Sequence, residues 1–302
     1  MSPLLALPLL AVVLVGCGGA GEVGPERTPW TPIARTLTGP MDPRSPNVCN
    51  RGGVRCIDAV VTEMTRRFDP LAAGCDHRAP FALMYLRVTE AVGRAERSGS
   101  LRADRTYLSH LDAVFGQLYF DASDAWAAGQ REAVPAAWQI AFEAANRRRV
   151  SGIGDLLLGL NAHISRDLPF AVASIGLGGR NGAARARAFA EINEVLADVQ
   201  SAILREASTR FDPSIAGFSL PLLKVDAATV GLLIGRWRDA ALRDGRRLLR
   251  AKTPAGRAAV TRTIEDNAAG RAAIIVAATS RVPFSDAGKA RDRFCASAAA
   301  AA

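Results

Sequence analysis

Apolar residues recur at spacings of three and four along most of this chain, which places them on one face of a helix. In the segment 105–126, Tyr107, Leu111, Val114 and Leu118 follow this spacing. The same pattern predicts helices over residues 57–68, 80–97, 105–126, 134–148, 153–168, 183–209, 226–249, 254–278 and 284–295. We therefore expect an all-α fold of about eight packed helices.

The composition agrees with helices. Hydrophobic residues make up 49% of the 302 positions, enough for a substantial core. Alanine, leucine and arginine dominate, whereas β-branched and aromatic residues are sparse, which favours helix over strand. We expect Pro169 to end the helix before it, because the residue preceding a proline avoids the α conformation. The glycine-rich stretch at 176–182 is expected to be a turn.

No shift in composition and no linker divides residues 48–296, so we predict one domain there. Residues 1–16 are predicted to be a signal peptide. Residues 17–47 are rich in Gly, Pro and Thr and are predicted to be a lipidated cysteine followed by a flexible tether. Residues 297–302 are expected to form a low-complexity tail.

The start of the chain predicts export. Its first seventeen residues, MSPLLALPLLAVVLVGC, contain no charged side chain and are too short to span a bilayer. The final LVGC is similar to the lipobox of bacterial lipoproteins, and this resemblance implies that Cys17 is acylated and anchors the protein to the outer face of a membrane. Because no basic segment precedes the apolar run, an ordinary signal peptide or an uncleaved anchor is the alternative. Each of these readings places the domain outside the cytoplasm.

Besides Cys17 the chain has four cysteines, Cys49, Cys56, Cys75 and Cys295. An even number in an oxidising compartment predicts two disulfides, for which three pairings are open. A bridge from Cys295 back to the region of the other three would close nearly the whole domain. A metal site is the rival interpretation, but there is no C-x-x-C pair and no spacing of a zinc ribbon or finger.

The formal net charge of +9 comes almost entirely from arginine. An exported protein meets little nucleic acid, so we expect no nucleic-acid partner, and attraction to anionic lipids or wall polymers instead. The candidate surface for such partners is one stripe of the predicted helix 226–249, formed by Arg236, Arg243, Arg247 and Arg250. The alternative is an ion-paired face in contact with solvent, because Asp239 and Asp244 precede two of these arginines by four and three residues.

The segment LLLGLNAHISRDLPF, residues 156–170, places polar side chains within an apolar run. His163 and Asp167 are four residues apart and therefore lie on the same helix face as neighbouring leucines. Burying either group without a partner would cost roughly 1–3 kcal/mol. They must then bond to each other, to another side chain, to water or to a metal.

This segment, with YLRVTEAV at 85–92, FGQLYFDA at 115–122, VPAAWQIAF at 134–142, EINEVLADV at 191–199 and GRWRDAALRDGRRL at 235–248, resembles the bacterial domain-of-unknown-function family 5995. The resemblance extends from about residue 57 to residue 249 and implies a single helical domain and no particular reaction. More distantly, His163, Asp167 and the proline that follows look like one helix of the zinc-dependent phospholipase C and nuclease proteins. Those proteins use many histidines, and this chain has three, so a mononuclear site is the most it could build.

A metal site would use a small set of side chains. Its ligands would be His163, Asp167 and His77, around one divalent ion such as zinc. Asp112 is expected to point inward from its helix and could act as the catalytic carboxylate. His110 lies off the apolar stripe of the same helix and is expected at the surface.

Three functions stay open from the sequence. The one we favour is a non-enzymatic, membrane-anchored surface protein whose helical domain binds an envelope ligand or a partner, with Asn161, Arg166 and Asn193 as candidate binding residues. The second is a metal-dependent hydrolase acting on phosphoesters through His163 and Asp167. The third is a structural envelope protein in which these side chains form a hydrogen-bonded network that holds helices together.

Overall fold

A computed structural model describes residues 30–102, 104–177, 182–216, 219–220, 223–224, 227–280 and 287–300. Its longer helices are α3 (Val54–Ala73), α4 (Ala79–Ser98), α5 (Arg105–Ala127), α6 (Ala136–Asn146), α7 (Gly152–Asn161), α9 (Gly182–Arg210), α10 (Ala227–Arg250), α11 (Pro254–Thr279) and α12 (Ala287–Ala300). The shorter ones are α1 (Trp30–Thr36), α2 (Val48–Arg51) and α8 (Leu168–Ile175). Two residue pairs form the strands β1 (Ser219–Leu220) and β2 (Leu223–Lys224). The prediction of an all-α protein is confirmed.

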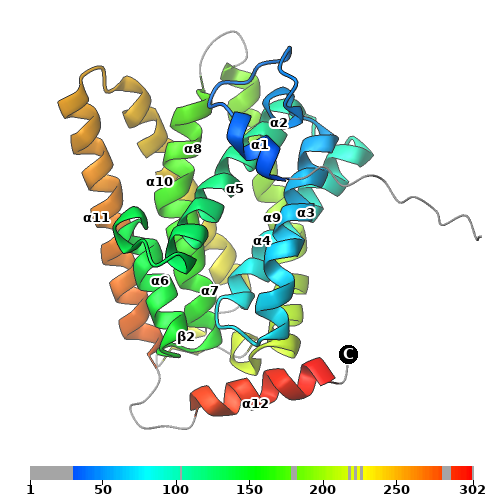
Figure 1. Ribbon diagram of the computed structural model, residues 1–302, viewed down its shortest axis with the longest axis vertical. Coiled ribbons are helices and arrows are strands. Elements are labelled where there is room, and N and C mark those ends of the chain that lie inside the picture. The colour runs from blue at the N-terminus through cyan, green and yellow to red at the C-terminus, as the bar shows by residue number, and fades with distance from the viewer. Residues whose placement is uncertain are drawn as a thin grey trace, which may run out of the picture.

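The helices pack around one hydrophobic core. Figure 1 shows α10 and α11 along one edge of the molecule and α3 and α4 along the other, with α5 to α8 between them. The helix α9 packs against α4 and α10, and α12 crosses one end of the molecule (Figure 1). A continuous cluster of buried apolar side chains extends from Trp30 in α1 to Cys295 in α12. Both ends of the described chain therefore belong to the packed structure.

Two glycines allow helices to approach each other closely. A Cβ atom at Gly159 of α7 would lie 2.4 Å from the ring of Phe81 in α4, and one at Gly245 of α10 would lie 2.6 Å from Val172 in α8. No real side chain tolerates these distances, so glycine is required at both points of contact. The first contact sets the distance between α4 and the chain segment that carries His163.

The predicted helices all have counterparts in the described residues, but the expected end at Pro169 is wrong. A π-helical turn, Ala162–Asp167, continues the chain from α7 directly into α8, which carries Pro169 in its first turn. The N–H of Leu168 donates to the carbonyl of His163, five residues earlier. Proline is compatible with this arrangement because its missing N–H falls where a new helix begins.

The two predicted disulfides are confirmed, and the structure decides their pairing. Cys49 is bonded to Cys56, seven residues away, and Cys75 to Cys295, 220 residues away. The second bridge fastens α12 to the loop between α3 and α4.

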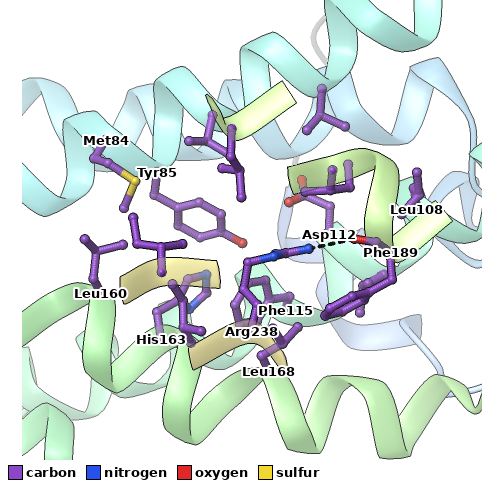
Figure 2. Close-up of a pocket in the computed structure, with 17 residues that line it drawn as sticks. Met84, Tyr85, Leu108, Asp112, Phe115, Leu160, His163, Leu168, Phe189 and Arg238 are labelled. Carbon is purple, nitrogen blue, oxygen red and sulfur yellow. Dashed lines mark hydrogen bonds between the residues drawn. The ribbon is translucent and has the colours of Figure 1, made fainter. Parts of the chain in front are cut away.

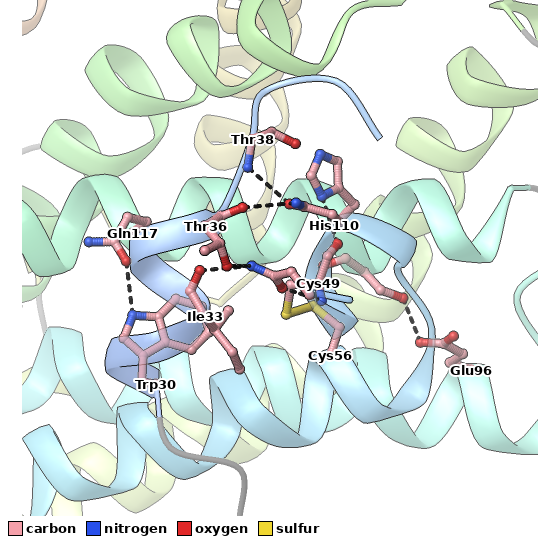
Figure 3. The surroundings of a disulfide bond; sticks show 12 residues. Trp30, Ile33, Thr36, Thr38, Cys49, Cys56, Glu96, His110 and Gln117 are labelled. Atoms are coloured by element: carbon pink, nitrogen blue, oxygen red, sulfur yellow. Dashed lines mark hydrogen bonds between the residues drawn. A yellow bond between two sulfur atoms is a disulfide. The ribbon is translucent and has the colours of Figure 1, made fainter. Parts of the chain in front are cut away.

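The predicted tether, residues 17–47, is wrong for its second half. Trp30 and Ile33, one turn apart in α1, are buried against the domain, and the ring of Trp30 meets that of Phe120 edge-on at 5.4 Å. The Trp30 indole N–H donates to Gln117 at 2.9 Å, and the side chain of Asn47 donates to the carbonyl of Ile33 at 2.8 Å (Figure 3). The prediction relied on the high content of Gly, Pro and Thr and overlooked Trp30 and Ile33. The predicted signal peptide, Cys17 and the rest of residues 17–29 lie outside the described residues.

The prediction that His110 lies at the surface is also wrong, because the residue is fully buried. Its Nδ1 lies 2.7 Å from the carbonyl oxygen of Cys49 (Figure 3). Its Nε2 lies 2.7 Å from the carbonyl oxygen of Gly39. The ring therefore joins α5 to the N-terminal segment. His110 is off the main apolar stripe of α5 because it faces the N-terminal segment rather than the core. The sequence interpretation treated that segment as a tether and therefore expected His110 at the surface.

The C-terminal tail is also shorter than predicted. Residues 297–300 belong to α12 rather than to a low-complexity tail, because alanine has the highest helix propensity of all residues. None of the described helices is both long and apolar enough to cross a bilayer.

Candidate functional site

The π-helical turn Ala162–Asp167 directs polar side chains into the core. His163 and Asp167 are 2% and 0% exposed, whereas Ser165 and Arg166 of the same turn are partly exposed. A π turn places one additional residue in the helix and is often found at functional sites. The pair that the sequence indicated is therefore buried, and its partners decide what it can do.

Asp167 is surrounded by donors. Its Oδ2 accepts the indole N–H of Trp138 at 2.8 Å and its Oδ1 accepts from the guanidinium of Arg166 at 3.0 Å. Arg166 also donates to Glu265 of α11 at 2.9 Å. The Nδ1 of His163 lies 3.4 Å from Asp167 Oδ2. Because an ionised carboxylate only accepts, the proton between these two residues belongs on Nδ1.

His163 is held between aromatic rings, and one of its nitrogens has no partner. Its ring is stacked on Phe115 with centroids 3.5 Å apart, and the ring of Tyr85 lies 4.2 Å away. Burial lowers the pKa of His163, and the neighbouring Asp167 opposes this shift only in part. The imidazole is then neutral at pH 7, and its buried Nε2 is an acceptor without a hydrogen-bond donor.

His163 contributes to the wall of a pocket of about 90 Å³ (Figure 2). Residues of α4, α5, α7, the π turn, α8, α9 and α10 line it, and most of them are apolar, including Met84, Leu108, Leu160 and Phe189. A smaller hollow of about 30 Å³ shares five of these residues and extends between α7 and α9. The two hollows are therefore neighbours, and both have mainly apolar walls.

Tyr85 and Asp112 supply further unpartnered polar atoms to this wall. The Tyr85 hydroxyl and the Asp112 Oδ2 are buried and have no hydrogen-bond partner. A Cβ atom at Gly116 would lie 3.4 Å from that hydroxyl, so Tyr85 reaches α5 one turn after Asp112. Burial, with a smaller contribution from Glu96, raises the pKa of Asp112 to about 7. Burial also raises the pKa of Tyr85 well above its usual value.

Arg238 of α10 is a buried cation in the same wall. It is 7% exposed, its Nε donates to Asn193 at 2.7 Å, and its Nη2 donates to the carbonyl of Phe189 at 3.2 Å. Burial lowers its pKa to about 10, and Asp239 opposes this shift. Figure 2 shows the Tyr85 hydroxyl, the Asp112 carboxylate and the Arg238 side chain turned toward the middle of the pocket.

The sequence interpretation missed Arg238 and Tyr85 as site residues. A signal was available for Arg238, because it lies four residues after Ile234 and three before Ala241, on the apolar stripe of its helix. A charge on that stripe indicates a buried guanidinium. No comparable signal marked Tyr85, since a tyrosine on an apolar face is common in cores.

Residues 57–278, which include every residue of this pocket, match a family of unknown function, DUF5995. The chain belongs to this family. The match confirms the resemblance found in the sequence and extends beyond residue 249 through nearly all of α11. No curated protein and no solved structure matches this DUF5995 chain.

The metal set predicted for the DUF5995 chain is not brought together. His77 lies between two carboxylates, with Nδ1 3.0 Å from Asp155 and Nε2 3.1 Å from Asp292, and so joins α7 to α12. His163 has Asp167 beside it and no second histidine. Within the described ranges, no group of three or more His, Cys, Asp or Glu side chains could hold a metal ion. His77 as a ligand beside His163 is therefore wrong, because both of its nitrogens are engaged elsewhere.

The predicted ligand-binding residues of the DUF5995 chain fall in different places. Asn161 is fully buried and donates to the carbonyl of Ala268 at 2.8 Å, which joins α7 to α11. Arg166 is held by Asp167 and Glu265 outside the pocket. Asn193 reaches the pocket indirectly, because its side chain accepts the Nε–H of Arg238.

The arginine stripe is exposed, as the helix pattern predicts. Arg236, Arg243, Arg247 and Arg250 are all exposed on α10. The predicted pair between Asp244 and Arg247 forms at 2.9 Å. In the described part of the chain, Arg243 has no acidic side chain within the 4.0 Å of an ion pair, so the pair with Asp239 does not form.

Proposed function

We propose that this protein binds a small, mainly apolar ligand with one polar end in the pocket between α4, α5, α9 and α10. The observation that supports this most directly is the combination of an apolar wall with three buried polar atoms that lack partners, the Tyr85 hydroxyl, Asp112 Oδ2 and His163 Nε2. Ligand pockets usually have such a wall, with a few polar groups that fix the orientation of the ligand.

A purely structural network is less consistent with these atoms. The part of the network around Asp167 is satisfied, because Trp138 and Arg166 both donate to its carboxylate. Buried polar groups in native proteins are nearly always hydrogen-bonded, and each one left unpaired costs roughly 1–3 kcal/mol. Three such atoms in the wall of one pocket are accounted for by a ligand that pairs with them.

The second candidate, a metal-dependent hydrolase, has weaker support. His163 Nε2 is free to act as a base or a ligand, and Asp112 lines the same pocket. The described residues bring no third ligand to that place. We therefore propose binding without chemistry as the function of this site.

We also propose that the domain works outside the cytoplasm, anchored through an acylated Cys17. The apolar run that ends at Cys17 and the two disulfides support this location, since disulfides persist in oxidising compartments. The four exposed arginines of α10 would then attract anionic headgroups or wall polymers.

The experiment that tests ligand binding uses residues 18–302, which lack the apolar run and the cysteine that would be acylated. Trifluorobutanol, a small neutral alcohol whose binding can be followed by fluorine NMR, is titrated into the protein. Val88 lines both hollows, so the larger side chain of Val88→Phe would occupy space where they meet. In the matched control, Val61→Phe, the change is at a half-buried valine of α3 that does not line the pocket.

We expect Val88→Phe to weaken the binding of trifluorobutanol at least about tenfold, because the alcohol and the phenyl ring compete for the same volume. Val61→Phe should change the affinity less than about twofold. Equal binding of trifluorobutanol by the parent and by a folded Val88→Phe variant would mean that the pocket is not a binding site.

A further inference from the structure

Arg238 forms no ion pair with an acidic side chain in the part of the chain described. Its guanidinium is buried, lies 4.4 Å from the ring centre of Phe189, and has no carboxylate within the 4.0 Å of an ion pair. Buried charges in proteins are almost always paired, because desolvation costs several kcal/mol per ion. Among the described residues, its hydrogen bonds go to two carbonyl-type oxygens, those of Asn193 and Phe189.

The guanidinium also has donors to spare. A guanidinium has five N–H groups in a planar fork, and two of them are used by Asn193 and Phe189. The remaining three belong to a side chain that lines the pocket (Figure 2). Such a fork matches the two oxygens of a carboxylate.

We infer that the ligand of this pocket is a carboxylic acid with a short apolar body, and that Arg238 binds its carboxylate. This inference rests on the proposed function, because it names the ligand class for the same site. The carboxylate supplies the missing counter-charge, and the apolar wall accepts the rest of the molecule.

Tyr85 and Asp112 fit the same class of ligand. The Tyr85 hydroxyl is a donor without an acceptor, and a carboxylate oxygen is an acceptor. With its pKa near 7, the Asp112 carboxyl is largely protonated at pH 6 and can donate as well. At that pH an alkanoic acid is ionised, since ordinary carboxyl groups have a pKa of about 4.

The size of the pocket limits the apolar body. The hollows of about 90 and 30 Å³ are smaller together than the cavity of about 150 Å³ that takes benzene in another protein. A chain of about five carbons beyond the carboxylate therefore fits, with Arg238 at one end and Leu204 at the other.

The test compares four competitors that share a six-carbon body, namely hexanoate, 1-hexanol, hexylamine and hexyl phosphate. Each one is used to displace trifluorobutanol from residues 18–302 at pH 6. We expect hexanoate to compete at a concentration at least about tenfold lower than 1-hexanol, and hexylamine to be the weakest. Equal competition by 1-hexanol would overturn the assignment of a carboxylate, and tighter binding of hexyl phosphate would overturn the choice of this anion.

Variants connect this preference to Arg238. Arg238→Gln should abolish the advantage of hexanoate over 1-hexanol, while Arg238→Lys, which keeps the charge and loses the fork, should retain part of it. Arg243→Gln, at an exposed arginine of the same helix, should behave like the parent. If melting curves show that Arg238→Gln does not fold, Arg238→Lys and the competitors on the parent decide the question.

The two proposals fail in distinguishable ways. If Val88→Phe blocks the binding of trifluorobutanol but hexanoate and 1-hexanol compete equally, the pocket binds ligands and only the assignment of a carboxylate is wrong. If the binding of trifluorobutanol does not depend on Val88, the proposed function fails, and the carboxylate assignment fails with it.

Discussion

The imidazole of His163 lies flat against the ring of Phe115, with centroids 3.5 Å apart and an angle of 9° between the planes. Tyr85 covers a second side of the same imidazole at 4.2 Å. A neutral histidine in such surroundings packs as an aromatic side chain. It also presents one nitrogen to the pocket wall, so its contributions to packing and to binding can be separated by substitution.

Two substitutions at His163 should have different effects on stability. His163→Ala removes the ring from between Phe115 and Tyr85 and should lower the free energy of unfolding by about 2–4 kcal/mol. His163→Phe keeps a ring there and gives up only the 3.4 Å contact with Asp167, so its loss should be about 1 kcal/mol. Urea denaturation measures both, and equal losses would show that the contact with Asp167 matters more than the stacking.

Asp112 should make stability depend on pH. Burial raises its pKa to about 7 in the folded protein from 3.8, so the folded protein keeps a proton that the unfolded chain releases above about pH 4. The contribution of Asp112 to stability therefore falls as the pH rises from about 4 to about 7. Asp112→Asn cannot ionise and should be more stable than the parent at pH 8 by about 2–4 kcal/mol, with little difference at pH 4.

Chemical denaturation at several pH values checks the effect of Asp112→Asn. Asp69→Asn, at an exposed position of α3, is the control and should follow the parent at every pH. A constant difference between Asp112→Asn and the parent would show that this carboxyl does not titrate in the range given.

The two disulfides should contribute unequally. In the chain-entropy picture, closing 220 residues through Cys75 and Cys295 stabilises the fold by about 5 kcal/mol, and closing seven through Cys49 and Cys56 by about 2 kcal/mol. The Cys75→Ala, Cys295→Ala double variant should therefore melt at a lower temperature than the Cys49→Ala, Cys56→Ala variant. The reverse order in calorimetry would contradict this expectation.

His110 should hold the N-terminal segment on the domain. His110→Ala removes the imidazole that contacts the carbonyl oxygens of Cys49 and Gly39, which should loosen the segment and speed the cleavage by trypsin after Arg44. His77→Ala is the matched comparison, because it should loosen α12 and leave Arg44 protected. Peptide mapping after brief digestion distinguishes the two, and unchanged cleavage in His110→Ala would contradict the assigned role.

The sequence allowed the helices to be predicted because their signal is local. The spacing of Tyr107, Leu111, Val114 and Leu118 is a property of one segment, and α5 follows from it. The helix end predicted at Pro169 was wrong for the same reason. The rule that a proline ends the preceding helix is local, and it does not anticipate a π turn that leads directly into α8. Trp30 and Ile33 were missed because two apolar residues within a proline-containing stretch are too weak a signal without their partner, Phe120.

The site could be predicted only in part. His163 and Asp112 were indicated as polar residues on apolar helix faces, and both line the pocket. The grouping of His77 with His163 could not be checked from the sequence, because distances between helices depend on contacts such as that of Gly159 with Phe81. Arg238 could be recognised as a candidate binding residue only from the structure, which shows that it is buried and has no ion-pair partner among the described residues.

Both ends of the described chain are fastened, by His110 and the Cys49–Cys56 bridge at one end and by the Cys75–Cys295 bridge at the other. Fraying from the termini is therefore suppressed, and local opening must begin within the chain. In α9, which forms one wall of the pocket, only Ala188, Phe189, Ile203, Ala207 and Ser208 are buried. Regions with few buried contacts open first. Because both ends are fastened, we expect the first local opening of the fold within the chain, and α9, with few fully buried residues for its length, is the helix where we expect it.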